Sequence, residues 1–297
     1  MTKMISFEEG EAHLDWIALT EALIAGHRLP KARIEDVLIR NGDKTLLNRS
    51  AWIDGLGLAV KCATVFPGQD PMVNGSVSLF DGTTGVLDAF VDFHLVTKWK
   101  TVGDSLLGAR RLVRPDSRRI LIVGAGTQGS NLHAAYSALF PDATFAIWNR
   151  TQATAETFAQ SHDRTTVAPD LETAVREADI VTAATMTSEP LIRGDWLQPG
   201  QHIDLIGAYR SDMREADDAA LQRATVFVDS RDTTIPHIGE LMIPIASGAI
   251  SESDVVADFY DTDAVRRSSA DEITLFKNGG GAHLDLMVAR HIQELCG

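Results

Sequence analysis

Cysteine is scarce in this chain, and its scarcity limits what the protein can be. Only Cys62 and Cys296 occur among 297 residues. Two thiols are too few for a metal site of their own, and a single disulfide between such distant positions would be unusual. Both are therefore expected to be reduced thiols of a cytoplasmic protein, and no metal is expected.

Positive charge and long apolar runs are also lacking. The 27 basic residues are outnumbered by 41 acidic ones, which gives a net charge of −14 and argues against nucleic acid or an anionic membrane as partner. The first residues, MTKMISFEEGEAHLDW, lack the apolar core of a secretory signal, and no stretch is expected to span a bilayer. At this length the chain can form two domains.

A strand, a glycine-rich turn and a helix follow one another after residue 118. Ile120 to Val123 is an unbroken apolar run, typical of a strand buried on both faces of a parallel sheet. The turn consists of Gly124, Ala125, Gly126, Thr127, Gln128 and Gly129. Its first glycine permits the turn, its second lets the backbone approach a pyrophosphate, and its third lets the next helix lie close. That helix, expected at residues 130–139, would present N–H groups to the phosphates, so the stretch predicts a dinucleotide site.

The residues expected at the adenosine ribose indicate which dinucleotide binds. A strand over residues 144–148 delivers Asn149, Arg150 and Thr151 about 20 residues after the glycines. An NAD site usually has Asp or Glu there, which would repel a 2′-phosphate. An arginine and a hydroxyl favour NADP(H) as the cofactor, with NAD(H) as the second choice. Alternatively, Arg150 is a solvated surface residue without a role in binding.

The chain shows two different rhythms of secondary structure. A helix is expected at residues 15–25, and short runs at 36–39, 44–47, 57–65, 75–80 and 86–91 predict a mostly antiparallel sheet, followed by a helix at 97–112. Beyond residue 118, strands at 120–123, 144–148, 165–167, 180–184, 202–206, 225–228 and 273–277 alternate with helices at 156–161 and 171–178. Residues 251–268 are acidic and expected to be helical or loose, and a helix at 282–294 ends the chain. The predicted fold class is α/β, with a doubly wound parallel Rossmann sheet and a second α+β domain.

Few other residues carry chemistry on pattern alone. Lys61 stands in an apolar run, where burial would lower its pKa, although a lysine on a wet strand face has the same pattern. The glycines at 279–281 open a helix and indicate either an anion-binding turn or close contact of the helix. His202 is expected to be structural, and His237 with Glu240 lacks a third metal ligand.

Collinear blocks over nearly the whole chain resemble the ornithine cyclodeaminase/mu-crystallin family. They lie at residues 61–68, 97–105, 114–118 with the glycine turn, 147–151, 199–208, 214–215, 228–230 and 273–277. The blocks at 148–151 and 189–200 are most similar to the mu-crystallin branch, whose members reduce cyclic ketimines with NADPH. The resemblance implies a homodimer, with residues 1–112 and 272–297 as the substrate-binding and dimerisation domain around a Rossmann domain of residues 113–271.

The resemblance also implies roles for single residues. Lys61 coincides with the family's active-site lysine, and Arg33 falls at the matching distance for the arginine that binds the substrate carboxylate, with Arg49 as a rival. A second family arginine is replaced by Lys100, which keeps the charge but loses the bidentate fork. Gly207 is expected at the cofactor.

Tyr209 is the more informative departure from the family pattern. Ornithine cyclodeaminases and related alanine dehydrogenases carry an aspartate there, and a phenol with an ordinary pKa of about 10 is a poor base at neutral pH. Tyr209 could still donate a hydrogen bond, or contact the nicotinamide. The departure favours reduction of a preformed imine over cyclodeamination.

The resulting hypothesis is an NAD(P)H-dependent reductase of a 2-imino acid, with Lys61, Arg33, Lys100 and Tyr209 at the reacting centre. A cyclic ketimine such as Δ1-pyrroline-2-carboxylate or Δ1-piperideine-2-carboxylate is the expected substrate by resemblance. Three alternatives stay open: a cyclodeaminase, a reductase of an acyclic imino acid of the alanine or iminosuccinate type, and a dinucleotide-binding protein without turnover.

Overall fold

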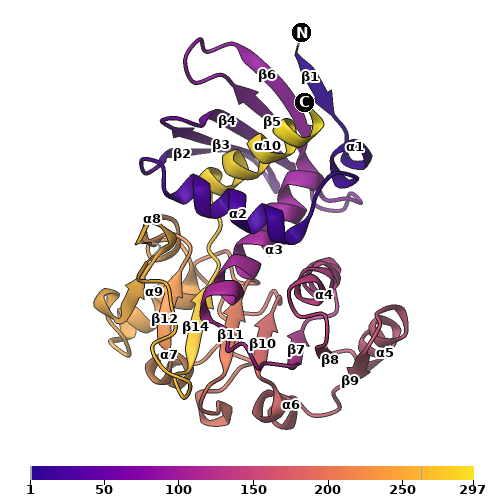
Figure 1. Ribbon diagram of the computed structural model, residues 1–297, viewed down its shortest axis with the longest axis vertical. Helices are drawn as coiled ribbons and strands as arrows, with labels where there is room; N and C mark the ends of the chain where they lie inside the picture. The colour runs from indigo at the N-terminus through magenta and orange to yellow at the C-terminus, as the bar shows by residue number, and fades with distance from the viewer. Residues whose placement is uncertain (1, 262) are drawn as a thin grey trace. The chain divides into compact units, whose positions relative to one another are not determined.

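The chain forms two compact units in the computed structural model, which describes residues 2–261 and 263–297 (Figure 1). One unit consists of Met1–Gly103 and Gly280–Gly297, and the other of Asp104–Gly279. The long helix α3 (Phe93–Leu112) passes from the first unit into the second. The predicted fold class is confirmed, since a parallel sheet with flanking helices is inserted in a mixed α+β unit. The predicted domain boundaries at residues 112 and 271 stay a prediction.

The first unit is built on a six-stranded sheet with the order β1-β6-β5-β4-β3-β2. The strands are β1 (Lys3–Ile5), β2 (Arg33–Asn41), β3 (Lys44–Ile53), β4 (Gly57–Val65), β5 (Val73–Phe80) and β6 (Leu87–Asp92). The mostly antiparallel sheet that the sequence predicted is confirmed; β1, which was not predicted, adds a parallel pair with β6. Strands β2 and β3 are longer than expected, because they form one hairpin whose turn contains Gly42 at φ +62°.

Alternation along β4 gives this sheet two different faces. Ala59, Lys61 and Ala63 are buried, whereas Val60 and Cys62 between them are partly exposed. The buried face lies against α10 (Ala282–Cys296), which also contacts α2 (Trp16–His27), and the short helix α1 (Phe7–Glu11) completes the unit (Figure 1). Because side chains of a strand alternate between faces, the neighbours of Lys61 on this face are decided by strand register.

The second unit contains an eight-stranded, fully parallel sheet with the order β13-β12-β14-β11-β10-β7-β8-β9. Its strands are β7 (Arg119–Val123), β8 (Thr144–Trp148), β9 (Thr165–Val167), β10 (Ile180–Ala183), β11 (His202–Leu205), β12 (Thr225–Val228), β13 (Val255–Ala257) and β14 (Thr274–Lys277). The direction of winding reverses between β7 and β10. Open parallel sheets bind ligands at such a switch point, outside the carboxyl ends of the strands.

The helices and one strand of this unit differ from the sequence prediction. They are α4 (Thr127–Leu139), α5 (Gln152–Ser161), α6 (Leu171–Glu177), α7 (Asp218–Arg223), α8 (Arg231–Thr234) and α9 (Gly239–Ser247). Helix α4 begins at Thr127 and not at residue 130, because Gly126 is its N-cap. Helices α7 to α9 were missed, since they are short and α9 contains Pro244. The segment 251–268 was expected to be helical or loose, and this was wrong for β13, which pairs with β12. Residue 262 of this segment lies outside the described residues.

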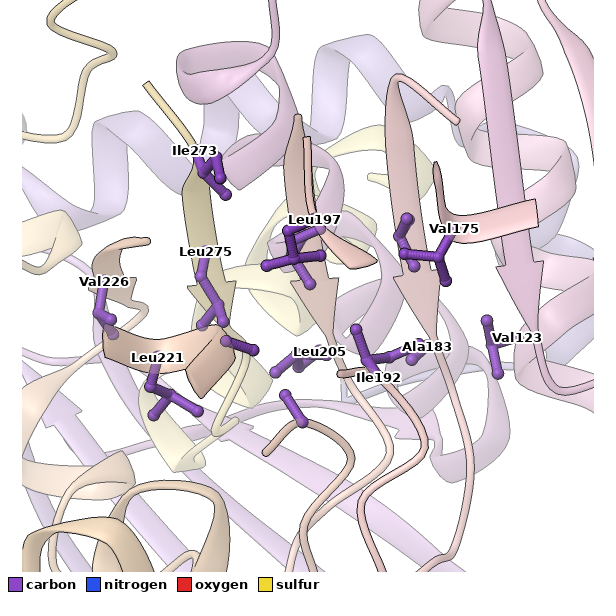
Figure 2. Packing of buried hydrophobic residues seen from close by; sticks show 14 of the residues in the cluster. Val123, Val175, Ala183, Ile192, Leu197, Leu205, Leu221, Val226, Ile273 and Leu275 are labelled. Atoms are coloured by element: carbon purple, nitrogen blue, oxygen red, sulfur yellow. The ribbon is translucent and has the colours of Figure 1, made fainter. Parts of the chain in front are cut away.

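A continuous apolar core holds the carboxyl ends of these strands in place. Figure 2 shows Val123 of β7, Ala183 of β10, Leu205 of β11 and Leu275 of β14 together with the helix residue Leu221, all of them buried. Each fully buried valine or leucine side chain among them contributes about 1.5–3 kcal/mol to stability. The turns that follow the strands therefore start from rigid positions. Within the described residues, no helix combines the length and hydrophobicity that crossing a membrane requires.

Candidate functional site

The glycine turn after β7 has the geometry that a pyrophosphate needs. Gly124 has φ +111°, a backbone conformation that other residues rarely adopt. A Cβ on Gly129 would lie 2.2 Å from the carbonyl oxygen of Gly124, so only glycine allows helix α4 to approach the turn this closely. A Cβ on Gly126 would meet nothing within 4 Å, so the space above this residue is open. These three positions correspond to the tight turn, the close helix and the phosphate approach expected of the motif.

Helix α4 offers its first N–H groups next to this open space. Its N-cap, Gly126, has no side chain that could bind those groups. Asn149 fixes the turn from the neighbouring strand, because its Oδ1 accepts from the N–H of Ala125 at 3.2 Å and its Nδ2 donates to the carbonyl of Thr151 at 3.1 Å. An uncapped N-terminus of a 13-residue helix is a ready binding site for a phosphate group.

A cavity of about 620 Å³ lies over the turn, between the carboxyl ends of β7, β8 and β10. Six of the predicted cofactor residues line it: Gly124, Ala125, Gly126, Asn149, Arg150 and Thr151. The other side is formed by residues 184–189 and Leu191. Thr127, Gln128 and Gly129 lie in the first turn of α4, and Gly207 follows β11. The residues present therefore fit a dinucleotide, with the pyrophosphate at the turn and the ribose at residues 149–151.

Lys61 occupies the buried face of the other unit, on β4. Its ammonium donates to Thr97 Oγ1 at 2.7 Å and to Asp285 Oδ1 at 2.9 Å, and it lies 4.6 Å from the centre of the Phe93 ring. Its side chain is 6% exposed, and that of Asp285 1%. Its neighbours on the same face of β4 are the small residues Ala59 and Ala63.

The surroundings of this pair shift both pKa values. Burial lowers the pKa of Lys61 to about 8, with Asp285 opposing the change and Lys100 adding to it. Burial raises the pKa of Asp285, but Lys61, Lys100 and Arg49 together lower it to about 2. Both groups are therefore charged at neutral pH, and Lys61 is a stronger acid than an ordinary lysine.

Strand register brings Arg49 beside Lys61 and leaves Arg33 elsewhere. Arg49 is the direct partner of Lys61 in the β3–β4 ladder, so both side chains leave the sheet on the same face. Its guanidinium also pairs with Asp36 at 2.9 Å. Arg33 pairs with Trp52 in the β2–β3 ladder, on the opposite face, where its side chain is 71% exposed and forms an ion pair with Asp54. The structure thus does not bring Arg33 and Lys61 together.

Lys100 lies on α3 beside the start of α10. The residue is only 8% exposed, yet its ammonium has no hydrogen-bond or ion-pair partner among the residues that the structure describes. A Cβ on Gly280 would lie 2.8 Å from this ammonium, so the missing side chain of that glycine makes room for it. The N-cap of α10, Gly281, has no capping side chain. A buried cation next to an uncapped helix N-terminus is an arrangement that an anion would stabilise.

The other residues singled out in the sequence lie outside these two groups. Tyr209 belongs to the 104–279 unit, where its side chain is 57% exposed and the Arg210 guanidinium lies 5.5 Å from its ring. His202 is buried, contacts Thr274 Oγ1 at 2.9 Å and has a pKa lowered by burial to about 3, so it is neutral. His237 is exposed. No group of three or more metal-binding side chains occurs in the described part of the chain, where both cysteines are free thiols.

Two functional candidates received no role from the sequence. Asp285 lies in the predicted last helix without a predicted role, although an acidic residue in the apolar run from Leu284 to Val288 is a usable signal. Glu215 was noted only as part of a family block, and it is fully buried. Its contacts become visible only when the turns after β10 and β11 are in place.

The fold and the site define a class of protein: a dinucleotide-binding α/β protein with a buried lysine and carboxylate on a separate unit. The sequence pattern of the ornithine cyclodeaminase/mu-crystallin family matches residues 54–296. The chain belongs to this family, as the sequence blocks predicted.

Known proteins are similar over 80% or more of this chain. The Δ1-pyrroline-2-carboxylate reductase of Paracoccus denitrificans is 49% identical, covering 99% of this chain and 96% of that protein. The ketimine reductase mu-crystallin of Rattus norvegicus is 32% identical, over 80% of this chain and 75% of that protein. An archaeal alanine dehydrogenase dimer with bound NAD has 25% sequence identity and a TM-score of 0.89, over 99% of this chain and 95% of that one.

Proposed function

We propose that this chain is an NAD(P)H-dependent imine reductase that converts a 2-imino acid into an L-amino acid. The observation that carries the proposal is the buried ion pair of Lys61 and Asp285, electrostatically coupled to the buried ammonium of Lys100. Reduction of an imino acid needs a proton for the imine nitrogen and a cation for the carboxylate. The first unit contains groups for both, and the second unit contains a site that fits the dinucleotide.

Lys61 is the proposed proton donor. Its ammonium has three N–H groups, of which two donate to Thr97 and Asp285, so one can bind the imine nitrogen of a substrate. The pKa of about 8 keeps the group mostly protonated at neutral pH and makes it a better acid than an ordinary lysine. Asp285 holds the ammonium in place and stabilises its charged form.

The substrate carboxylate is proposed to bind beside Lys100. The ammonium of Lys100 and the first N–H groups of α10 both favour a negative charge between them. Arg49 shares the face of Lys61, and we propose it as the carboxylate-binding arginine in preference to Arg33, whose side chain points to the opposite face. A single carboxylate between these cations would leave Lys61 free for the imine nitrogen.

The dinucleotide is proposed to bind at the glycine turn, and NAD(P)H bound there supplies the hydride. The role of this chain is to hold it: the turn and α4 bind the pyrophosphate, and residues 149–151 bind the ribose. We infer a preference for NADPH, because Arg150 is exposed on the wall of the cavity and Asn149 stands where NAD sites carry an acidic residue.

The substrate is proposed to be a cyclic ketimine, Δ1-pyrroline-2-carboxylate or Δ1-piperideine-2-carboxylate, which gives L-proline or L-pipecolate. This choice is supported by the 49% identical relative, a Δ1-pyrroline-2-carboxylate reductase, and by the ketimine reductase named above. Tyr209 in place of an acidic residue favours reduction of such an imine over cyclodeamination, because cyclodeamination needs a base that a phenol does not supply.

We also propose a homodimer formed through the open face of the first unit's sheet. Exposed or partly exposed apolar residues cover this face: Met4, Val37, Ile39, Trp52, Leu58, Val60 and Phe80. A hollow of about 380 Å³ runs between Trp52 and Phe80, and an apolar face of this extent favours a partner surface of the same kind. Two free thiols fit a reducing compartment, so we infer the cytoplasm as its location.

The test is consumption of NADPH and of NADH with a panel of cyclic and acyclic imino acids. We expect the wild-type protein to oxidise the cofactor with a cyclic ketimine, and Lys61→Ala to abolish this. Lys44→Ala removes an exposed lysine of the same sheet and serves as the control. Ammonia release from ornithine in the presence of NAD, without any imine reduction, would replace the proposal by a cyclodeaminase.

A further inference from the structure

One buried carboxylate joins two of the turns at the dinucleotide site. Glu215 is fully buried, in the segment between β11 and α7. Its Oε1 accepts from the backbone N–H and from the hydroxyl of Thr185, both at 2.7 Å, and its Oε2 accepts from the N–H of Gly207 at 2.6 Å. Thr185 follows β10 and Gly207 follows β11. A single side chain therefore binds the carboxyl ends of two neighbouring strands.

The turn after β10, which Glu215 binds, is also in contact with the glycine turn. Thr185 lines the dinucleotide cavity. A Cβ on Gly124 would lie 3.2 Å from Thr185 Cγ2 and 2.8 Å from the carbonyl oxygen of Ala184. A Cβ on Gly207 would lie 2.0 Å from the carbonyl oxygen of Thr185, so these two segments are in direct backbone contact. A shift of Thr185 would therefore be transmitted to Gly124, the first residue of the glycine turn.

The carboxylate is held by charge and by backbone as well. Glu240, also buried, accepts from the N–H groups of Glu215 and Ala216 at 2.7 and 2.9 Å. Burial raises the pKa of Glu215 to about 7, with Lys277 lowering it and Glu240 raising it further. Lys277 is fully buried and donates to the carbonyl of Leu205 at 2.9 Å, close to the same turn. Two acidic groups and one cation thus surround the junction of the turns.

We propose that Glu215 is a positioning residue for the dinucleotide, which acts by holding the turn after β10 between the turn after β11 and the glycine turn. The proposal rests on the proposed function, because it assumes that the cavity over the glycine turn takes NAD(P)H. Glu215 does not line that cavity, so its effect on the cofactor passes through Thr185 and Gly207.

The variant Glu215→Gln tests this, because its side chain has nearly the same shape but only one acceptor oxygen. The amide NH2 cannot accept, so either Gly207 or Thr185 loses its partner. The matched control is Asp204→Asn, another buried carboxylate of this unit. Asp204 accepts from the hydroxyls of Ser105, Tyr136 and Thr182, none of which lines the cavity.

The measurements are the Kd of NADH and of NADPH by fluorescence titration, the Tm without cofactor, and kcat at saturating cofactor. We expect Glu215→Gln to raise both Kd values about tenfold or more, since one of the turns is left with a buried N–H that has lost its acceptor. In Glu215→Gln, the kcat at saturating cofactor and the KM of the imino acid should stay within about twofold of wild type. Asp204→Asn should leave both Kd values within about twofold of wild type, even if its Tm falls as much as that of Glu215→Gln. Equal Kd values for Glu215→Gln and wild type, or an equal rise in Asp204→Asn, would overturn the proposal.

A second variant decides the case in which Glu215→Gln does not fold. Glu215→Asp keeps the charge next to Lys277 but shortens the side chain by one methylene, so it cannot reach both turns. A rise in Kd of about tenfold supports the positioning role, and an unchanged Kd overturns it. Failure of the wild-type protein to bind either dinucleotide would contradict the proposed function itself, which separates the two results.

Discussion

Replacing Asp285 with asparagine should shift the pH dependence of imine reduction to lower pH. Asp285 Oδ1 lies 2.9 Å from the ammonium of Lys61, and both side chains are buried. The carboxylate opposes the effect of burial, which has lowered the pKa of Lys61 to about 8. An asparagine has almost the same shape and still offers an oxygen to the ammonium, but it carries no charge. The pKa of Lys61 therefore falls further in the variant.

The size of the shift follows from the strength of the lost interaction. A hydrogen bond between charged groups contributes about 1.5–3 kcal/mol, which corresponds to about one to two pKa units for Lys61. With a pKa of about 6.5 in place of 8, the protonated fraction at about pH 7.5 falls about eightfold. If Lys61 must be protonated to donate to the imine nitrogen, kcat/KM falls by the same factor.

The assay is kcat/KM for a cyclic ketimine between about pH 6 and pH 9 in wild type and Asp285→Asn. The two profiles are compared with each other because the substrate itself titrates in the same way in both. Asp88→Asn is the control, since Asp88 forms an ion pair with Arg290 of α10 at 2.9 Å and has no contact with Lys61. Profiles of the same midpoint in Asp285→Asn and wild type would refute the role given to Lys61.

The variant should also be less stable, and in a pH-dependent way. Without Asp285 the charged form of Lys61 is buried and unpaired, which is strongly destabilising. Because the folded-state pKa of Lys61 is depressed below its ordinary value of 10.5, this penalty is present at pH values below the folded-state pKa. It disappears as the pH rises towards 10.5. The Tm of the variant relative to wild type should therefore recover at high pH.

Four further predictions concern binding and assembly. Lys100→Ala should raise the KM of the imino acid about tenfold or more, with partial recovery in Lys100→Arg; an unchanged KM would remove Lys100 from the carboxylate site. Arg49→Ala should raise the same KM about tenfold, while Arg33→Ala stays within about twofold; the reverse order would restore Arg33 as the carboxylate-binding arginine. Arg150→Ala should raise the Kd of NADPH about tenfold and leave that of NADH nearly unchanged, and a parallel change in both would argue against a 2′-phosphate contact. Val60→Asp should convert a dimer into monomers in sedimentation experiments, because a charge would be buried in the proposed interface, and an unaffected dimer would show that another surface is used.

The dinucleotide site was predictable because its signal is local. The glycine turn needs a buried strand before it, a helix after it and glycine at three positions, and all of these are adjacent in the chain. Most strands and the long helices followed from periodicity for the same reason. Strands β1 and β13 and the helices α1 and α7 to α9 were not predicted; each is three to nine residues long, which gives a period little room to develop.

The sequence by itself determined the fold class, the family, the glycine turn with its ribose position, and Lys61 as the leading candidate for chemistry. Only the tertiary structure decided which charged groups surround that lysine. Asp285 is 224 positions away from Lys61 in the chain. Arg49, and not Arg33, lies on the same face of the sheet as Lys61 because of the strand register. A register shift of one residue would move each side chain to the opposite face, and the register depends on long-range pairing. No single stretch of sequence predicts contacts of this kind, because the partners are brought together only when the sheet and the last helix pack against each other.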